Sequence, residues 1–450
     1  MELKNKRVLV VGLGKSGLAA ALFLRDRGAR VTVSDTRSAG ALGDQIPALL
    51  DAGIMVEAGG HGLLTFRRQD LIIVSPGVPL DTPEVKQAVQ LGLTVIGELE
   101  LASRFLIGEI VAITGSNGKT TTTTLLGQIF ADAGMRTQVG GNIGLPVIDL
   151  IAESNPETWN VLEVSSFQLE TTVDFRPKIA LVLNITPDHL DRHKTFERYA
   201  AAKARITACQ GPTDYLVLNA EDKATQMVAA KTKAQIYWFS ALRQIKQGAF
   251  VYGESIFFLA QEGGKPDPVL PVAEITLKGA HNIENVLAAV CAARLAGISN
   301  KVIRATVARF HAVEHRLELV KTVAGVEYYN DSKATNVDAT MKAIASFPRG
   351  VHLILGGKDK DSDYTLLAPL LGERVKAVYT IGSAAEKIEQ ELAGVVKMVS
   401  AGTLSEAVAQ AAKSAESGDI VLLAPACSSF DQFENYEQRG HAFREAVSKL

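Results

Sequence analysis

Short apolar runs and longer amphipathic segments alternate along almost the whole chain. Short apolar runs predict buried strands, and apolar residues at three- and four-residue spacing predict helices. Such alternation is typical of parallel β-sheets whose strands are joined by helices that cover the sheet faces. The pattern falls into three blocks, which predict domains at residues 1–97, 98–311 and 312–450.

Each block has its own set of predicted strands. In the first block they lie at residues 8–11, 30–34, 71–74 and 93–96, followed by a helical connector at 98–105. In the second block, strands are predicted at 109–114, 160–165 and 178–184. Short strands follow between 234 and 277, and the Gly and Pro residues that separate them predict a small antiparallel subsheet. Two helices then follow, at 281–296 and up to about residue 310. The third block has a hairpin around residues 324–325 and strands at 351–355, 377–381, 396–400 and 420–423.

A glycine-rich loop, Thr114-Gly-Ser-Asn-Gly-Lys119, joins the first strand of the second block to a helix. Its backbone N–H groups would point into one concavity, where the helix N-terminus and Lys119 add positive charge. Thr120 would offer a hydroxyl to a Mg²⁺ ion on the phosphates. The loop is shorter than a Walker A motif, because Ile113 stands where that motif has its first glycine. The interpretation as a triphosphate cradle therefore depends on the strand–loop–helix context, and the alternative is a glycine-rich turn with a solvated lysine.

A second phosphate-binding pattern lies in the first block. Gly12-Leu-Gly-Lys-Ser-Gly17 fills the first strand–helix turn, and Asp35 ends the second strand. This matches the dinucleotide fingerprint, in which a diphosphate lies on a helix N-terminus and an acidic side chain binds a ribose or similar group. The alternative is tight packing of helix on strand. Two phosphate sites favour an enzyme that joins a nucleotide-linked substrate to ATP chemistry over one that transfers a hydride.

Polar residues also follow the strands of the second block. Glu163 interrupts an apolar strand across the sheet from the phosphate loop, where a carboxylate can hold Mg²⁺ directly or through water. In the polar segment 184–193, His189 is the candidate metal ligand or phosphate neighbour, and His193 is expected to be structural. Zinc is not expected, because no cysteine joins this segment. Lys203 lies on a helix of small residues, and its spacing alone indicates only a surface lysine.

Three polar loops of the third block each follow a predicted strand, at residues 330–336, 356–361 and 424–433. Ligands of open α/β sheets gather at the carboxyl ends of the strands, so we expect the three loops to converge. Lys333 and Lys360 would attract a small dicarboxylate to that crevice.

Composition limits the partners. The formal net charge is -2 and no long basic run occurs, so nucleic acid is not expected. The three cysteines are widely spaced without a zinc-binding pattern, which suits a reducing cytoplasm. The first residues lead into a strand without an apolar signal region, and no apolar stretch reaches bilayer-spanning length. We therefore expect a cytoplasmic protein without membrane insertion, and nothing in the sequence requires more than a monomer.

Nine motifs in chain order resemble the Mur ligase family: TGSNGKTT, GGNIG, LEVSSFQLE, NITPDHLDRH, KGAHNIENVLAA, EHRLE, NDSKATN, GGKDKD and APACSSFDQFENYEQRG. The SSFQLE and SSFDQF segments resemble the member that adds D-glutamate. The Asp-Asn-Pro-Arg-like run expected of the diaminopimelate- or lysine-adding member does not occur. With the strand pattern, the resemblance implies an α/β fold of three domains: a Rossmann-like N-terminal domain, a central P-loop-type ATPase domain with a small antiparallel subsheet, and a C-terminal Rossmann-like α/β domain.

The resemblance also implies a role for each block. The first would bind the diphosphate substrate UDP-N-acetylmuramoyl-L-alanine through Gly14, Lys15, Ser16, Asp35, Thr36, Arg37 and Gly77. ATP would be bound by Gly115, Ser116, Asn117, Gly118, Lys119, Thr120, Thr121, Asn282 and Asn285, helped by Arg316 and Asp331. Two Mg²⁺ ions would be held by Thr120, Glu163, His189 and a carbamylated Lys203. D-glutamate would be surrounded by Lys333, Thr335, Lys360, Ser429, Phe430 and Tyr436, the last at a position where the family also has Phe.

The implied reaction is ATP-dependent amide formation in peptidoglycan precursor synthesis. The substrate carboxylate would attack the γ-phosphate of ATP, and the amine of D-glutamate would attack the resulting acyl phosphate. The expected catalytic residues are Lys119, His189, Lys203 and Asn142. Asn142 would contact the substrate near the reacting centre. Two alternatives stay open: a folylpolyglutamate synthase, which shares the central motif but lacks the first block, and a nicotinamide-dependent oxidoreductase, which would use Gly12–Gly17 and not Lys119.

Overall fold

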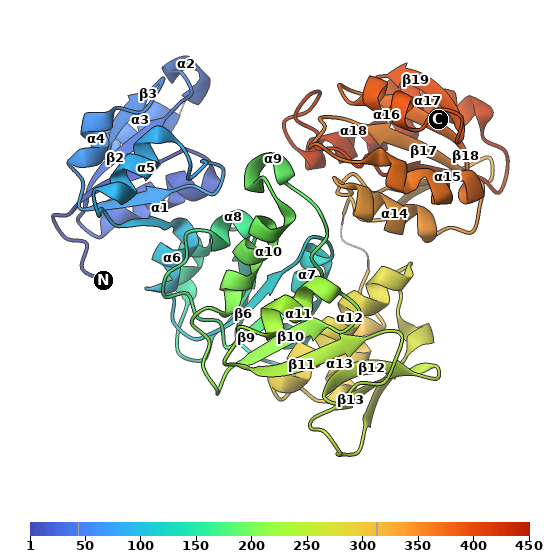
Figure 1. Cartoon of the computed structure of the whole chain (residues 1–450), viewed down its shortest axis with the longest axis horizontal. Coiled ribbons are helices and arrows are strands. Elements are labelled where there is room, and N and C mark those ends of the chain that lie inside the picture. The colour runs from blue at the N-terminus through green and yellow to red at the C-terminus, as the bar shows by residue number, and fades with distance from the viewer. Residues whose placement is uncertain (44, 312–313) are drawn as a thin grey trace.

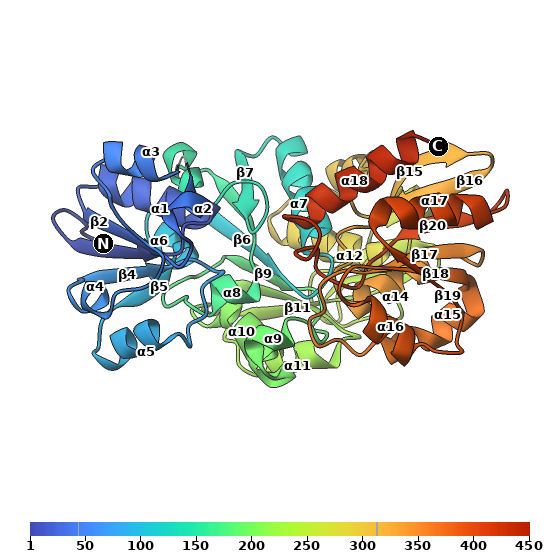
Figure 2. The ribbon, with the colours of Figure 1, turned by 90° about the horizontal axis from the view of Figure 1, so that it is seen from above.

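The computed structural model describes residues 1–43, 45–311 and 314–450. Within these residues the strands form three sheets, of five, nine and six strands, in chain order. Figure 1 shows the corresponding lobes in blue, in cyan through green to yellow and in orange to red, and Figure 2 shows from above that the central lobe lies between the other two. The predicted three-part α/β fold is confirmed. The boundary after residue 97 stays a prediction, and the predicted start of the third domain, residue 312, lies outside the described residues.

The first sheet is parallel and has the order β3-β2-β1-β4-β5. Its strands are β1 (Arg7–Val11), β2 (Arg30–Asp35), β3 (Met55–Ala58), β4 (Leu71–Val74) and β5 (Val95–Gly97), and its helices are α1 (Lys15–Asp26), α2 (Ala39–Leu42), α3 (Gln45–Asp51), α4 (Leu63–Arg67) and α5 (Pro83–Gln90). The strand order reverses between β1 and β4, which is where ligands bind in such sheets. The sequence missed β3, because this edge strand is only partly buried and has no continuous apolar run.

The central sheet has the order β14-β13-β12-β11-β10-β9-β6-β8-β7. Its strands are β6 (Glu109–Thr114), β7 (Thr137–Gly141), β8 (Trp159–Glu163), β9 (Ile179–Val182), β10 (Tyr215–Asn219), β11 (Gln235–Ser240), β12 (Gly248–Tyr252), β13 (Ser255–Leu259) and β14 (Asp267–Pro271). Of the predicted antiparallel strands, β12 and β13 are confirmed, and together with β14, which the sequence did not single out, they extend one edge of this sheet. Strand β11, which the sequence grouped with them, is parallel to both its neighbours.

Helices cover both faces of the central sheet. They are α6 (Glu98–Ser103), α7 (Lys119–Asp132), α8 (Ser166–Leu169), α9 (Leu190–His193), α10 (Phe196–Ala204), α11 (Lys223–Ala229), α12 (Ala280–Leu295) and α13 (Asn300–Val307), with a 3-10 helix η1 (Val147–Glu153) after β7. Residues 286–293 of α12 have no exposed surface, so this helix forms part of the core beside α7. No helix of the described residues is both long and apolar enough to cross a membrane.

The third sheet has the order β15-β16-β20-β17-β18-β19. Its strands are β15 (Glu318–Val323), β16 (Val326–Asn330), β17 (Val351–Gly356), β18 (Val375–Ile381), β19 (Lys397–Gly402) and β20 (Ile420–Leu423), and its helices are α14 (Val337–Ala345), α15 (Ala368–Arg374), α16 (Ala385–Glu391), α17 (Leu404–Ser414) and α18 (Tyr436–Ser448). The predicted hairpin is confirmed as the antiparallel pair β15–β16. Its turn residues Ala324 and Gly325 both have positive φ, as tight hairpin turns require.

Helix α6, which joins the first and second sheets, carries two buried carboxylates. Glu100 accepts hydrogen bonds from the backbone N–H groups of residues 173–175. Glu98 accepts one from Ile148 N at 2.7 Å, but its other oxygen has no hydrogen-bond partner among the described residues. Burial raises the pKa of Glu98 from 4.5 to about 7. The ionised form of Glu98 is therefore disfavoured in the folded protein.

We expect Glu98→Gln to remove part of the loss of stability that occurs as the pH rises. Between pH 4.5 and about 7 the unfolded chain releases this proton and the folded protein retains it, so the free energy of unfolding falls over that interval. Above it, the glutamine variant should be more stable than the wild type by at most about 3 kcal/mol, and below pH 4.5 the two should be similar. Urea unfolding at pH 5 and pH 8 tests this by fluorescence, because both tryptophans, Trp159 and Trp238, lie in the central sheet. An equal pH dependence for both proteins would contradict the prediction.

Candidate active site

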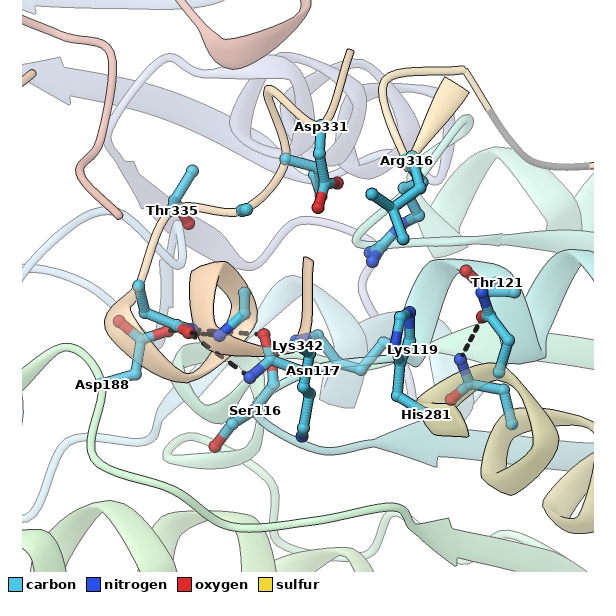
Figure 3. A pocket seen from close by; sticks show the side chains of 18 of the residues that line it. Ser116, Asn117, Lys119, Thr121, Asp188, His281, Arg316, Asp331, Thr335 and Lys342 are labelled. Atoms are coloured by element: carbon cyan, nitrogen blue, oxygen red, sulfur yellow. Dashed lines mark hydrogen bonds between the residues drawn. The ribbon is translucent and has the colours of Figure 1, made fainter. Parts of the chain in front are cut away.

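A cleft lies between the phosphate-loop end of the central sheet and the third lobe (Figure 3). It is lined from the central lobe by Ser116, Asn117, Gly118, Lys119, Thr121, Asn142, Glu163, Asp188, His189, His281, Asn282 and Asn285, and from the third lobe by Arg316, Asp331, Lys333, Thr335, Asn336, Lys342 and Tyr436. The cleft thus brings together most of the predicted nucleotide and amino-acid residues. Of the predicted residues in these two lobes, Gly115, Thr120, Lys203, Lys360, Ser429 and Phe430 are not part of its lining.

The phosphate loop has the geometry of an anion cradle. Gly118 has a φ of 85° and precedes α7, and a Cβ there would lie 2.2 Å from the Oδ1 atom of Asn285, so only glycine fits. The Nζ atom of Lys119 donates to the carbonyl oxygens of Gly115 and Ser116, each at 2.9 Å, and so lies across its own loop. Burial lowers the pKa of Lys119, and the carboxylate of Glu163 opposes this effect. The loop combines a lysine with the N-terminus of α7, and both favour a bound phosphate.

Glu163 ends β8, directly beside Ile113 of the neighbouring strand β6. Its two carboxylate oxygens accept hydrogen bonds from Thr120 Oγ1 and from Asn142 Nδ2, both at 2.8 Å. In the part of the chain that the structure describes, no group of three His, Cys, Asp or Glu side chains could hold a metal ion. One carboxylate with a hydroxyl beside a phosphate loop nevertheless fits Mg²⁺, which is usually bound by one or two carboxylates together with water and substrate phosphates.

His189 lies at the N-terminus of α9 in the left-handed conformation, with a φ of 54°. Its Nε2 atom is 3.7 Å from Asp188 Oδ2. Burial lowers the pKa of His189 to about 3, and neighbouring lysines add to this effect, so the ring is neutral at pH 7 and able to ligate a metal. His193, which was expected to be structural, is buried, and its Nε2 atom lies 3.0 Å from Ser166 Oγ.

Lys203 lies on α10 behind the cleft, and its interpretation as a surface lysine is wrong, because only 1% of the residue is exposed. Its Nζ atom donates to the carbonyl oxygen of Gly115 at 2.7 Å and lies 4.6 Å from the ring centroid of Tyr199. Among the described residues it forms no ion pair with a carboxylate. Burial lowers the pKa of Lys203 well below its usual value, and the charge of Lys119 lowers it further. The sequence could not show this burial, because the residues that cover Lys203 come from other parts of the chain.

The residues at the other end of the cleft come from α12 and from the start of the third lobe. Asn285 Nδ2 donates to Asn282 Oδ1 at 2.9 Å, which fixes both amides beside the phosphate loop. Opposite them, the Nε atom of Arg316 is buried without a hydrogen-bond partner among the described residues. Burial raises the pKa of Asp331 to about 7, although the charge of Arg316 opposes the shift. The sequence did not single out His281, which lies at the start of α12 and also lines the cleft (Figure 3).

The predicted amino-acid residues divide into two sets. Lys333 Nζ lies 3.6 Å from the ring centroid of Tyr436 and faces the cleft, and burial lowers the pKa of Lys333 to about 7. Lys360 Nζ instead contacts Asp188 Oδ1 at 3.1 Å and Thr335 Oγ1 at 3.5 Å. Ser429 is buried in the loop after β20, whereas Phe430 is 67% exposed.

Arg439, on α18, holds two of these loops together, and the sequence did not assign it a role. Only 1% of the residue is exposed, and its guanidinium donates to the carbonyl oxygens of Ser332, Cys427 and Ser428 and to the Ser332 hydroxyl. These residues adjoin Lys333 and Ser429. The predicted convergence of the loops at 330–336, 356–361 and 424–433 is confirmed by these bonds and by the bridge between Lys358 and Ser428.

The residues predicted to bind the diphosphate gather at the switch point of the first sheet and do not line the cleft. Gly14 caps α1, and Gly17 packs so closely that a Cβ would lie 2.0 Å from the carbonyl oxygen of Gly12. Asp35 accepts bonds from Leu13 N and Arg37, which outweigh the effect of burial and lower the pKa of Asp35 to about 2. Of the remaining predicted residues, Lys15 and Ser16 begin α1, and Thr36 and Gly77 lie in the loops after β2 and β4. The geometry suits both a diphosphate site and tight packing, so this role stays a prediction.

Comparison with known proteins adds the deciding observation. Three family models match consecutive parts of the chain: the MurD-like N-terminal domain of Mur ligases at residues 6–97, the Mur ligase middle domain at 113–293 and the glutamate ligase domain of Mur ligases at 315–427. The chain belongs to the Mur ligase family. The family resemblance seen in the sequence is thereby confirmed.

Curated relatives and solved structures extend this match. The Mur ligase described here is 66% identical to the UDP-N-acetylmuramoylalanine--D-glutamate ligase of Acidobacterium capsulatum, over 99% of this chain and 97% of the relative. It is 58% identical to the protein of the same name from Koribacter versatilis, over 100% and 99% of the two chains. Two solved structures from Thermotoga maritima share its fold. The UDP-N-acetylmuramate-alanine ligase MurC matches with a TM-score of 0.61 and 19% identity, over 99% of this chain and 100% of MurC. The MurF ligase in complex with ADP matches with a TM-score of 0.60 and 17% identity, over 93% of this chain and 95% of MurF.

Proposed function

We propose that this Mur ligase joins D-glutamate to UDP-N-acetylmuramoyl-L-alanine and converts ATP to ADP and phosphate. The observation that carries the proposal is the 66% identity, over 99% of the chain, to a relative that bears this activity in its name. The reaction belongs to the synthesis of peptidoglycan precursors in the cytoplasm, and its substrates are small molecules. We further propose that the chain works as a monomer.

In the first step, the alanyl carboxylate attacks the γ-phosphorus of ATP, an acyl phosphate forms, and ADP leaves. Lys119 and the N-terminus of α7 would stabilise the charge on the transferring phosphoryl group. Asn142, fixed by its bond to Glu163, would orient the substrate near the reacting carboxylate. This step requires positioning and charge stabilisation and no protein nucleophile.

Thr120, Glu163 and His189 would hold Mg²⁺, and a carbamylated Lys203 would add a second anionic ligand for two ions. When bound, these ions neutralise charge on the phosphates. Thr120 and Glu163 fit this role because they already share a 2.8 Å hydrogen bond at the phosphate loop.

In the second step, the uncharged amine of D-glutamate attacks the acyl carbon. The tetrahedral intermediate expels inorganic phosphate, and the new amide nitrogen loses a proton to solvent. Lys333 and Lys360 would bind the two carboxylates of D-glutamate, since both lie at strand ends of the third sheet that face the central lobe. Arg316 and Asp331 would border the nucleotide at the same interface.

One assay tests the proposal and separates it from the alternatives. Purified protein is incubated with ATP, Mg²⁺ and UDP-N-acetylmuramoyl-L-alanine, and ADP release is followed after addition of D-glutamate, L-glutamate, L-lysine or meso-diaminopimelate. We expect D-glutamate alone to stimulate release, and only in the presence of the UDP-linked substrate. Equal stimulation by another amino acid, or ADP release that does not depend on the UDP-linked substrate, would exclude the proposed function. The MurD-like match at residues 6–97 already argues against a folylpolyglutamate synthase.

A further inference from the structure

A hydrogen-bond network joins the phosphate loop to the start of α14 in the third lobe. Asn117 Nδ2 donates to Asp338 Oδ2 at 2.6 Å, across 221 positions of the chain. The side chains of Asn117 and Asn336 also exchange bonds of 3.3 and 3.4 Å. Thr186, in the loop after β9, donates to the same Asp338 oxygen at 3.3 Å. We call Asn117, Asn336 and Asp338 the interlobe latch.

The backbone of Asn117 is bonded to the central lobe, and its side chain is bonded to the third lobe. Its backbone is fixed within the central lobe, because Asn117 N donates to Asn184 Oδ1 at 2.8 Å and Asn184 Nδ2 donates to Asn117 O at 3.1 Å. Its side chain bonds, among the residues that the structure describes, only to residues of the third lobe. The orientation of this amide at the edge of the phosphate loop therefore depends on where the third lobe docks.

The network continues to residues of both halves of the proposed reaction. Asn336 Nδ2 donates to Asp188 Oδ2 at 3.0 Å, and Asp188 also pairs with Lys360, beside His189. On the other side, Lys342 Nζ lies 2.9 Å from Asp338 Oδ2 and borders the cleft (Figure 3). The latch thus connects the proposed D-glutamate residue Lys360 with the loop that would hold ATP.

We propose that Asp338 is a positioning residue that couples docking of the third lobe to the orientation of Asn117 in the phosphate loop. The inference rests on the proposed function for the substrates of the two lobes. A hydrogen bond to a carboxylate in a partly buried interface is stronger than one between neutral groups, and a network in which every member is bonded fixes one arrangement. If Asp338 had a purely local role, it would act only within α14, by stabilising the first turn of the helix and by pairing with Lys342 four residues later.

A double-mutant cycle separates the two roles. We expect Asn117→Ala and Asp338→Ala each to lower kcat by about tenfold, and the double variant also by about tenfold, because either change alone breaks the same bond. Asp338→Asn, which keeps an oxygen acceptor for Asn117, should retain most of the activity. The control pair is Asn117→Ala and Arg37→Ala, because Arg37 lies in the first lobe, outside the latch. In this double variant the loss in kcat/KM for the UDP-linked substrate should equal the product of the two single losses. Losses that also multiply for Asn117 and Asp338, or equal loss in the asparagine and alanine variants, would overturn the proposal.

Amide hydrogen exchange tests the latch without any substrate, and so independently of the proposed function. Ala339 N donates to Asn336 Oδ1 at 2.8 Å, so its exchange rate reports the order of the latch. We expect Asn117→Ala to speed exchange at Ala339 by about tenfold, although the substitution is in the other lobe. Lys119→Ala changes the same loop, but within the described part of the chain Lys119 bonds only to its own loop, so exchange at Ala339 should stay at the wild-type rate. Unchanged exchange in Asn117→Ala would refute the latch even if the wild type ligates D-glutamate.

Discussion

Lys119→Ala is expected to lower ADP formation by at least about a hundredfold, with both other substrates present, while the protein stays folded. The Nζ atom of Lys119 lies across the phosphate loop, 2.9 Å from the carbonyl oxygens of Gly115 and Ser116, and so places a positive charge where this loop would bind a phosphate. Removal of one group that stabilises transition-state charge costs about a hundred- to a thousandfold in kcat. Initial rates measured under saturating ATP, and circular dichroism of the variant, check the prediction.

The control is Lys246→Ala, because Lys246 is a highly exposed lysine of the same lobe whose ion pair with Glu262 is at the surface. Exposed pairs of this kind contribute little, so its activity should match the wild type. Near-normal ADP release by Lys119→Ala would refute the phosphate-loop assignment. Lys119→Arg should remain impaired, because a planar guanidinium has a different shape and hydrogen-bond geometry from an ammonium group in a loop this tight.

Much of the fold could be predicted because parallel sheets bury both faces of their strands. Strands such as β4 and β20 are apolar and buried at every position, so their runs are unambiguous in the sequence. The edge strand β3 was missed for the opposite reason, since Met55 is exposed and Glu57 interrupts the run. Strand β11 was assigned to the antiparallel group because the sequence does not reveal which neighbour a strand pairs with.

The site residues that a local motif determines were easier to predict than those that depend on contacts between lobes. Gly118 and Lys119 act within one strand–loop–helix unit, so their spacing in the chain nearly fixes their geometry. Asp338 and Arg439 instead bond to residues that are distant in the sequence, Asn117 and Ser332 respectively. Such bonds leave no local pattern. Lys203 is the clearest case, because a lysine among alanines gives no sign that another segment will cover it.

Lys203→Ala is expected to lose activity to a similar extent, and small carboxylates such as acetate or formate should partly restore it. Burial and the charge of Lys119 lower the pKa of Lys203, so part of its amine is neutral, and a neutral amine can attack CO₂. The new N–C bond and the loss of one proton convert the cation into a carbamate anion. Lys203 lies against Gly115 of the phosphate loop, where an anion could act as the fourth ligand beside Thr120, Glu163 and His189. In the alanine variant, a free carboxylate can occupy the vacated volume and supply that charge.

The matched control is Lys203→Met, which fills a similar volume but cannot form a carbamate. Methionine should preserve the packing against Tyr199 and leave no room for an added carboxylate, so this variant should be inactive, stable and insensitive to acetate. A purely structural lysine would behave differently: the alanine variant would lose thermal stability, acetate would restore nothing, and methionine would recover activity. Depletion of CO₂ and bicarbonate should lower wild-type activity and leave both variants unchanged, because only Lys203 can bind CO₂ at this position. Full activity of Lys203→Ala without any carboxylate would show that the site needs no anion here, and the metal ligands would then be limited to Thr120, Glu163 and His189.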